Sequence, residues 1–139
     1  MSSFRIFDIA GSAMNAQNVR LNLTASNLAN AESVSSSINT TYRSRQPVFA
    51  AQLTDAMGNM HEAAGVHFAG VVESQAPLRM EHAPNNPAAN EDGYIFKPNV
   101  NVMDDMANMM SASRSYEQNV QMADTAKQLM LMTLRMGQN

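Results

Sequence analysis

The C-terminal part of the chain, residues 101–136, reads NVMDDMANMMSASRSYEQNVQMADTAKQLMLMTLRM. It contains neither proline nor glycine, and selected side chains recur at alternating steps of four and three residues, as in helices that pack lengthwise against other helices. This spacing predicts one long helix with coiled-coil periodicity. The main seam consists of Val102, Met106, Met109, Ser113, Tyr116, Val120, Ala123, Lys127, Met130 and Leu134, and a flanking seam of Met122, Ala126, Leu129, Thr133 and Met136.

The ends of this helix carry the expected signals. Asn101 is a candidate N-cap, and Asp104 and Asp105 fall in the first turn, where acidic side chains complement the helix dipole. Gly137 is a candidate stop signal. A helix of this length spans roughly 54 Å at 1.5 Å per residue, which is longer than the interior of a compact domain of 139 residues.

Residues 4–31 predict a second helix at the N-terminus, because they lack proline and place apolar residues three and four apart. Gly11 lies inside it and costs about 1 kcal/mol relative to alanine. Either another backbone approaches closely at Gly11, or the glycine is merely tolerated. Two adjacent stripes form a broad packing face: Phe7, Ala10, Met14, Leu21 and Leu28, and Ile6, Ile9, Ala13, Ala16 and Leu23.

The region between the helices has a different composition, with all five prolines between residues 32 and 99. Short strands are predicted at 42–53, 66–73, 78–81 and 94–96. We therefore predict a mainly α fold with a small β-rich insert, in which long N- and C-terminal helices pair as a coiled-coil-like hairpin. The predicted regions are an N-terminal axial helix at 1–33, an irregular β-rich insert at 34–99 and a C-terminal axial helix at 100–139.

The overall composition narrows the classes of protein. Charged residues make up 15% of the 139 residues and the net charge is −3, which argues against nucleic acid as a partner. There are no cysteines, so disulfides and thiolate chemistry are excluded. No apolar run reaches 18 residues, so direct membrane insertion is not expected. The N-terminus lacks the apolar core of a secretory signal, which predicts a cytoplasmic protein or one exported without a cleaved signal peptide.

The surfaces of the predicted helices suggest that they need partners. Residues 1–33 contain only Arg5, Asp8, Arg20 and Glu32 as charged residues, whereas an isolated coiled coil carries many Glu and Lys residues at its flanks. Uncharged polar side chains are less costly to bury when neighbours can hydrogen-bond to them. We infer a subunit whose terminal helices contact several neighbours, with a loosely packed soluble dimer as the alternative.

The residues offer no pattern typical of catalysis or of metal binding. His61, His67 and His82 are spaced by 6 and 15 residues, which matches no common metal-ligand motif, and we expect them to be exposed loop residues. The methionines of the C-terminal helix serve as adaptable packing side chains. We predict no enzyme activity, no cofactor, no metal and no small-molecule substrate.

Both ends of the chain carry strings that resemble the bacterial flagellar rod and hook axial family, and most closely its proximal rod proteins. The resemblance covers nearly the whole chain except about 35–64. The N-terminal strings are IFDIAGSAM at 6–14, RLN at 20–22 and SNLANA at 26–31, and the C-terminal strings are DGY at 92–94, PNVNV at 98–102 and MMSASRSYE at 109–117.

This resemblance implies a structural subunit of the basal-body proximal rod, which polymerises through its terminal helices into the tubular shaft that transmits motor torque. It implies a periplasmic rod location, type III export, and contacts with other rod proteins, with further copies of the chain and with the junction of export gate and MS ring. By analogy, Asn27 and Asn30 fix the angle at which the chain leaves the first helix. The alternative is a cytoplasmic helical adaptor or chaperone that binds partner helices. The predicted assembly interface comprises Ile6, Phe7, Ile9, Met14, Leu21, Leu23, Asn27, Leu28, Asn30, Val102, Met106, Met109, Tyr116, Val120, Met130 and Leu134.

Overall fold

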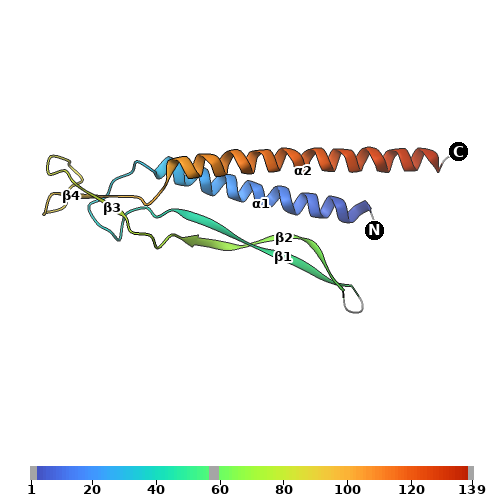
Figure 1. The fold of residues 1–139 in the computed structure, drawn as a ribbon, viewed down its shortest axis with the longest axis horizontal. Helices are drawn as coiled ribbons and strands as arrows, with labels where there is room; N and C mark the ends of the chain where they lie inside the picture. The colour runs from blue at the N-terminus through green and yellow to red at the C-terminus, as the bar shows by residue number, and fades with distance from the viewer. Residues whose placement is uncertain (1–2, 57–59, 138–139) are drawn as a thin grey trace. The chain divides into compact units, whose positions relative to one another are not determined.

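A computed structural model describes residues 3–56 and 60–137, with side chains for residues 5–52 and 65–137. Two helices lie at the ends of the described chain and four strands lie between them (Figure 1). In chain order the elements are α1 (Ser3–Asn30), β1 (Arg45–Ala56), β2 (Met60–Glu73), β3 (Arg79–His82), β4 (Tyr94–Lys97) and α2 (Val102–Met136).

Both predicted helices are confirmed, but the fold is mixed rather than mainly α. The helices are 28 and 35 residues long, which leaves more than half of the 139 residues outside them. The insert is also less irregular than predicted, since β1 and β2 are strands of 12 and 14 residues. β1 continues through Pro47 because each strand of a two-stranded sheet has a free edge, where a missing N–H disrupts nothing.

The predicted start of α2 is confirmed in atomic detail. The Asn101 side-chain oxygen accepts a hydrogen bond from the Met103 backbone N–H at 3.2 Å, and its amide nitrogen donates to Asp104 at 2.6 Å. These contacts satisfy a helix-start donor that would otherwise have no partner. The N–H of Gly137 bonds back to the Thr133 carbonyl at 3.1 Å, at the end of the helix.

The described chain divides into two compact units, and each helix contributes one part to each unit. The first unit comprises Met1–Val19, Val48–Gly70 and Ser111–Asn139, and the second comprises Arg20–Pro47 and Val71–Met110. In the second unit β3 pairs antiparallel with β4, with Arg79 opposite Lys97 and His82 opposite Tyr94. Ile95, Phe96 and Val100 are buried there and form a small apolar core.

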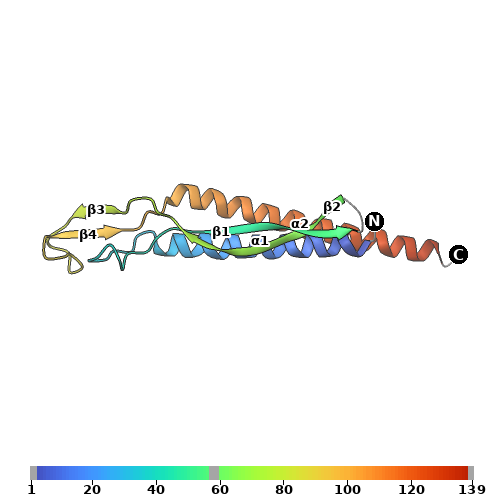
Figure 2. The ribbon, with the colours of Figure 1, turned by 90° about the horizontal axis from the view of Figure 1, so that it is seen from below.

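In the first unit, β1 and β2 lie along α1 on the side away from α2 (Figures 1 and 2). The Ser12 hydroxyl links the layers, because it donates to the Ile9 carbonyl at 2.8 Å and accepts from the Val66 N–H at 3.2 Å. Gly65 faces this hydroxyl, and a Cβ at Gly65 would lie 2.6 Å from Ser12 Oγ. The close approach suggested for Gly11 is therefore found at Gly65, since a Cβ at Gly11 would meet nothing within 4 Å.

Alanine substitutions at these two glycines are expected to act in opposite directions. Gly11→Ala should raise the free energy of unfolding of the isolated chain by up to about 1 kcal/mol. Alanine loses less backbone conformational entropy than glycine when the helix forms, and its methyl group would meet no neighbouring atom here. Gly65→Ala should lower the free energy of unfolding by at least ~1 kcal/mol, because φ is +146° and the new methyl group overlaps Ser12. Urea unfolding monitored by circular dichroism checks both variants, and equal effects would contradict the packing described.

Candidate assembly interface

The residues of α2 that the rest of the chain covers follow a stripe with alternating steps of three and four residues. Its most buried members are small: Ala112 is 0% exposed and Ala126 is 8% exposed. Small side chains let another helix approach closely, so the stripe is the one suited to packing within the chain. The stripe consists of Val102, Asp105, Met109, Ala112, Tyr116, Asn119, Ala123, Ala126 and Met130.

The predicted main seam shares every second position with this stripe, whereas four of its other five members are exposed and do not pack within the chain. Met106, Val120 and Leu134 are exposed, at 52%, 37% and 60%. The prediction rests on the alternating spacing alone, whereas the most covered residues of α2 within the chain are Ala112 and Ala126. The half-buried members of the seam are Val102, Met109, Ser113, Tyr116, Ala123 and Met130, and Lys127 is also exposed.

The covered side of α1 is also made of small or polar residues. Ala10, Ala16, Thr24 and Asn27 are buried, as is Ala31 directly after the helix. The predicted stripe that begins at Phe7 does face inward, whereas the stripe that begins at Ile6 is only partly covered, because Ile6 and Ile9 are exposed. Of the predicted interface residues on α1, the half-buried ones are Phe7, Met14, Leu21, Leu23, Leu28 and Asn30.

Large apolar side chains are therefore exposed around α2, which is unusual for a helix of a monomeric protein. They are densest in the last two turns, Leu129–Met136, which we call the α2 end. Only Met130 is half-buried there, and both views show that these turns run past the start of α1 (Figures 1 and 2). The exposed large apolar residues of α2 are Met103, Met106, Met110, Val120, Met122, Leu129, Leu131, Met132, Leu134 and Met136.

Asn27 is the most highly connected side chain in the second unit, and it is only 2% exposed. Its amide pairs with both backbone groups of Arg45: Oδ1 accepts from the N–H at 2.9 Å and Nδ2 donates to the carbonyl at 3.0 Å. Oδ1 also accepts from the Tyr42 hydroxyl at 2.9 Å. Asn27 thus attaches the first residue of β1 to the last turn of α1.

Asn99 holds the same stretch of chain from another side. Its Oδ1 accepts from the Ser44 N–H at 2.8 Å, and its Nδ2 donates to the carbonyls of Ser74 at 3.3 Å and Ala76 at 2.9 Å. Asn27 and Asn99 therefore bind consecutive residues at the start of β1. We call these two side chains and Tyr42 the asparagine cluster.

Two polar contacts join α1 to the start of α2 within this unit. Arg20 donates to Asn108 at 2.8 Å, and Asn27 Nδ2 lies 3.4 Å from Asp105 Oδ1. Burial raises the pKa of the Asp105 carboxyl, although the hydrogen bond from Asn27 opposes this effect and the charge of Asp104 adds to it. Because the folded-state pKa is raised, ionised Asp105 opposes folding, and its contribution becomes more favourable as the pH falls through that pKa.

Asn30 has a different role from Asn27. Its side-chain nitrogen donates to the Ser26 carbonyl of its own helix at 2.8 Å, and its carbonyl accepts from both the N–H and the hydroxyl of Ser33. Asn30 thus closes the end of α1. Sequence reasoning singled out both asparagines, but it missed Tyr42, Ser44 and Asn99 as partners, although Asn99 lies in the quoted string PNVNV.

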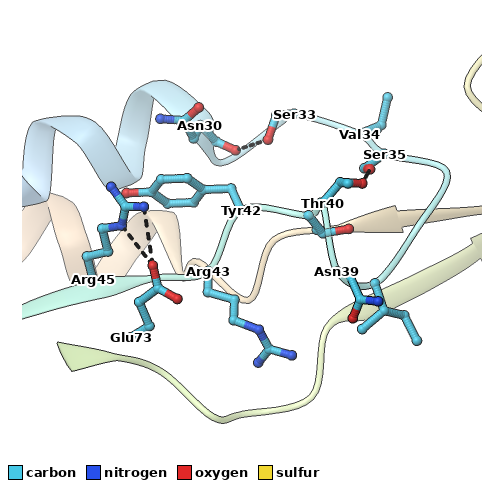
Figure 3. A pocket seen from close by; sticks show the side chains of 12 residues that line it. Asn30, Ser33, Val34, Ser35, Asn39, Thr40, Tyr42, Arg43, Arg45 and Glu73 are labelled. Carbon is cyan, nitrogen blue, oxygen red and sulfur yellow. Dashed lines mark hydrogen bonds and ion pairs between the residues drawn. The ribbon is translucent and has the colours of Figure 1, made fainter.

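A polar cleft of about 640 Å³ adjoins the asparagine cluster (Figure 3). Arg45 lies over the Tyr42 ring, 5.3 Å from its centroid, and forms an ion pair with Glu73 at 3.2 Å. Arg43, another lining residue, donates to the Ser74 carbonyl at 3.2 Å. The residues lining this cleft include no histidine and no acid other than Glu73, so the cleft lacks the paired groups of general acid–base catalysis.

The histidines lie in strands rather than in the predicted loops. His67 is exposed in β2, and His82 in β3 stacks edge-on against Tyr94, whereas the side chain of His61 lies outside the described residues. Among the described side chains, no group of three acidic or histidine residues is arranged to hold a metal ion. No described helix is both long and apolar enough to cross a membrane.

Comparison with family models defines the class of protein. A model described as "Flagella basal body rod protein" matches residues 7–34, and one described as "Flagellar basal body rod FlgEFG protein C-terminal" matches residues 91–136. The two matches cover most of α1, all of α2 and most of the strings that carry the resemblance. The class is that of the flagellar basal-body rod proteins.

Individual relatives narrow the class. The chain is 49% identical over 138 residues to the flagellar basal-body rod protein FlgC of Salmonella typhimurium, and 50% identical to that of Escherichia coli O6:H1. Each alignment covers 99% of this chain and the whole relative. FlgC of Bacillus subtilis is 29% identical over 149 residues. The chain therefore belongs to the FlgC family of flagellar basal-body rod proteins, and the resemblance inferred from its end strings is confirmed.

Proposed function

We propose that the chain is a structural subunit of the proximal rod, which polymerises through α1 and α2 into the tubular shaft that transmits motor torque. The observation that supports this most strongly is the exposure of large apolar side chains along α2, which a neighbouring subunit has to cover. Membership of the FlgC family supports the same function. The relatives are named as rod components, which fits a protein without enzyme activity, and no relative quoted above supports an adaptor or chaperone.

In this proposal the segments 1–33 and 100–139 form the axial wall, and 34–99 is the insert. The predicted interface residues fall into two groups. Exposed residues such as Ile6, Met106 and Leu134 meet neighbours directly. Half-buried residues such as Met109 and Tyr116 pack within the subunit and border those contacts. Pairing of α1 with α2 as a coiled coil is part of the proposal.

The proposed partners are further copies of the chain, other rod proteins and the junction of export gate and MS ring. The proposed location is the periplasmic rod, reached by type III export without a cleaved signal peptide. The absence of cysteine suits a chain that passes unfolded through a narrow channel, since no disulfide could form on the way.

Replacing two exposed apolar residues of α2 tests this function. The Met106→Gln, Val120→Gln double variant should keep its helical content, since both side chains are exposed. In the assembly, the variant should lose roughly 3–6 kcal/mol of the stabilisation gained by burying these two apolar side chains. Cells that carry the variant in place of the wild-type gene should therefore build no rods and should not swim. Soft-agar motility and electron microscopy of basal bodies measure the outcome.

The matched control is the Met106→Leu, Val120→Ile double variant, which keeps both side chains apolar. It should support motility close to that of the wild type. Normal motility of the glutamine variant would contradict an assembly role for this face of α2.

A further inference from the structure

Three methionines form an exposed strip at the start of α2. Met103, Met106 and Met110 are three and four residues apart, so they lie on one face of the helix. They are 75%, 52% and 61% exposed, and all three belong to the second unit. We call these three residues the methionine strip. They are also the only exposed large apolar residues that α2 contributes to this unit, so methionine supplies the whole of this apolar surface.

Methionine is the side chain through which an oxidant can change this protein most readily. Cysteine and methionine are the residues with accessible oxidation steps, and the chain has no cysteine but 13 methionines. Hydrogen peroxide transfers one oxygen atom to the thioether sulfur. The O–O bond of the peroxide breaks, an S–O bond forms and water leaves, so that the sulfur is oxidised and the peroxide is reduced. Methionine sulfoxide reductases reverse the change.

Oxidation would replace the apolar surface of the strip by a polar one. A sulfoxide oxygen accepts hydrogen bonds, and burying such a group without a donor is unfavourable. The side chains one turn away from Met106 offer no donor, because all four are apolar. They are Val102, Met103, Met109 and Met110. The oxidised strip is therefore well solvated in water, but it is a poor surface for an apolar neighbour to cover.

The other methionines with described side chains differ from the strip in exposure or in surroundings. Met14, Met109 and Met130 are half-buried. Met80 is 61% exposed but lies in β3. Exposed methionines farther along α2 have leucines and a valine among their exposed neighbours, which peroxide leaves apolar. These methionines are Met122, Met132 and Met136. The strip is thus the part of α2 whose apolar character depends entirely on the oxidation state of sulfur.

Resting on the proposed function, we propose that the methionine strip is a reversible modification site, at which oxidation to sulfoxide by a peroxide keeps an unassembled subunit out of the rod. The free subunit is sensitive because the strip is exposed, and reduction of the sulfoxides restores its ability to assemble. In the assembled rod a neighbouring subunit covers the strip, which protects the sulfur atoms from peroxide.

Peptide mapping by mass spectrometry tests exposure and protection without any substitution. In the purified chain treated with hydrogen peroxide, the residues of the strip should form sulfoxide at least tenfold faster than Met109, with no change in circular dichroism. In isolated wild-type basal bodies, the strip should react at least tenfold more slowly than in the purified chain. Equal rates in the two samples would overturn the proposal.

Leucine substitutions test the consequence for assembly. Cells carrying the Met103→Leu, Met106→Leu, Met110→Leu triple variant, and wild-type cells, are grown with sublethal hydrogen peroxide while new rods form. New basal bodies are counted by electron microscopy, and each strain is compared with its own untreated culture. The wild type should lose at least four fifths of its new rods, and the triple variant less than half. Met80→Leu is the matched control and should lose as many as the wild type.

Two results of this experiment would overturn the proposal. One is an equal fractional loss in the wild type and the triple variant. The other is no loss in the wild type at a dose at which mapping shows the strip to be oxidised. Either result would leave the proposed function intact, because that function fails only if the Met106→Gln, Val120→Gln variant assembles rods without peroxide. The mapping decides the proposal by itself where leucine does not support assembly.

Discussion

Asn27→Ala is expected to destabilise the second unit by about 2–3 kcal/mol, because the substitution removes a hydrogen-bond partner from several part-buried groups. The backbone N–H and carbonyl of Arg45 lose their Asn27 partner, and the Tyr42 hydroxyl keeps only its 3.2 Å contact with the Ser26 hydroxyl. Urea unfolding should show the loss of stability. Hydrogen exchange at the Arg45 amide should accelerate by more than an order of magnitude, because this N–H loses its acceptor.

Two further variants make the test of Asn27 specific. Asn27→Asp keeps the acceptor for Tyr42 but loses the donor to the Arg45 carbonyl, so it should also be destabilised. Asn30→Ala serves as the matched control, because its side chain bonds only within its own helix, and it should cost about 0.5–1 kcal/mol. Equal losses for Asn27→Ala and Asn30→Ala would show that the cluster around Asn27 has no special role.

Deletion of residues 129–139 is expected to abolish rod assembly with little effect on the fold of the subunit. Of the described residues removed, only Met130 is half-buried, so the isolated chain should lose no more than about 1–2 kcal/mol of stability. The deletion removes five large apolar side chains that are exposed in the isolated subunit. If neighbouring subunits bury them, the assembly loses roughly 8–15 kcal/mol of hydrophobic stabilisation per subunit, before any opposing terms are counted. Swimming and basal-body counts in complemented cells measure the effect.

A shorter deletion, of residues 137–139, is the control, because it removes no large apolar residue. It should support motility close to that of the wild type. Loss of circular dichroism in the longer deletion would instead show that the α2 end stabilises the subunit itself, contrary to its exposure.

The periodicity of the two ends predicted both helices to within two residues, because helix formation depends on local spacing, caps and the absence of proline. The capping role of Asn101 followed from the same local signals. The strings at the two ends also sufficed to place the chain among the flagellar rod and hook proteins. These features depend on residues close together in the sequence, so the sequence by itself determined them.

The side of each helix that faces inward was decided only by the tertiary structure. The alternating spacing placed Met106 and Leu134 in the main seam, but it could not show that Ala112 and Ala126 are the residues of α2 that this chain buries. Asn99 similarly gains its role from Ser44, 55 residues away in the sequence. Such pairings depend on which small residues let two segments approach each other, and periodicity alone contains no information about the partner.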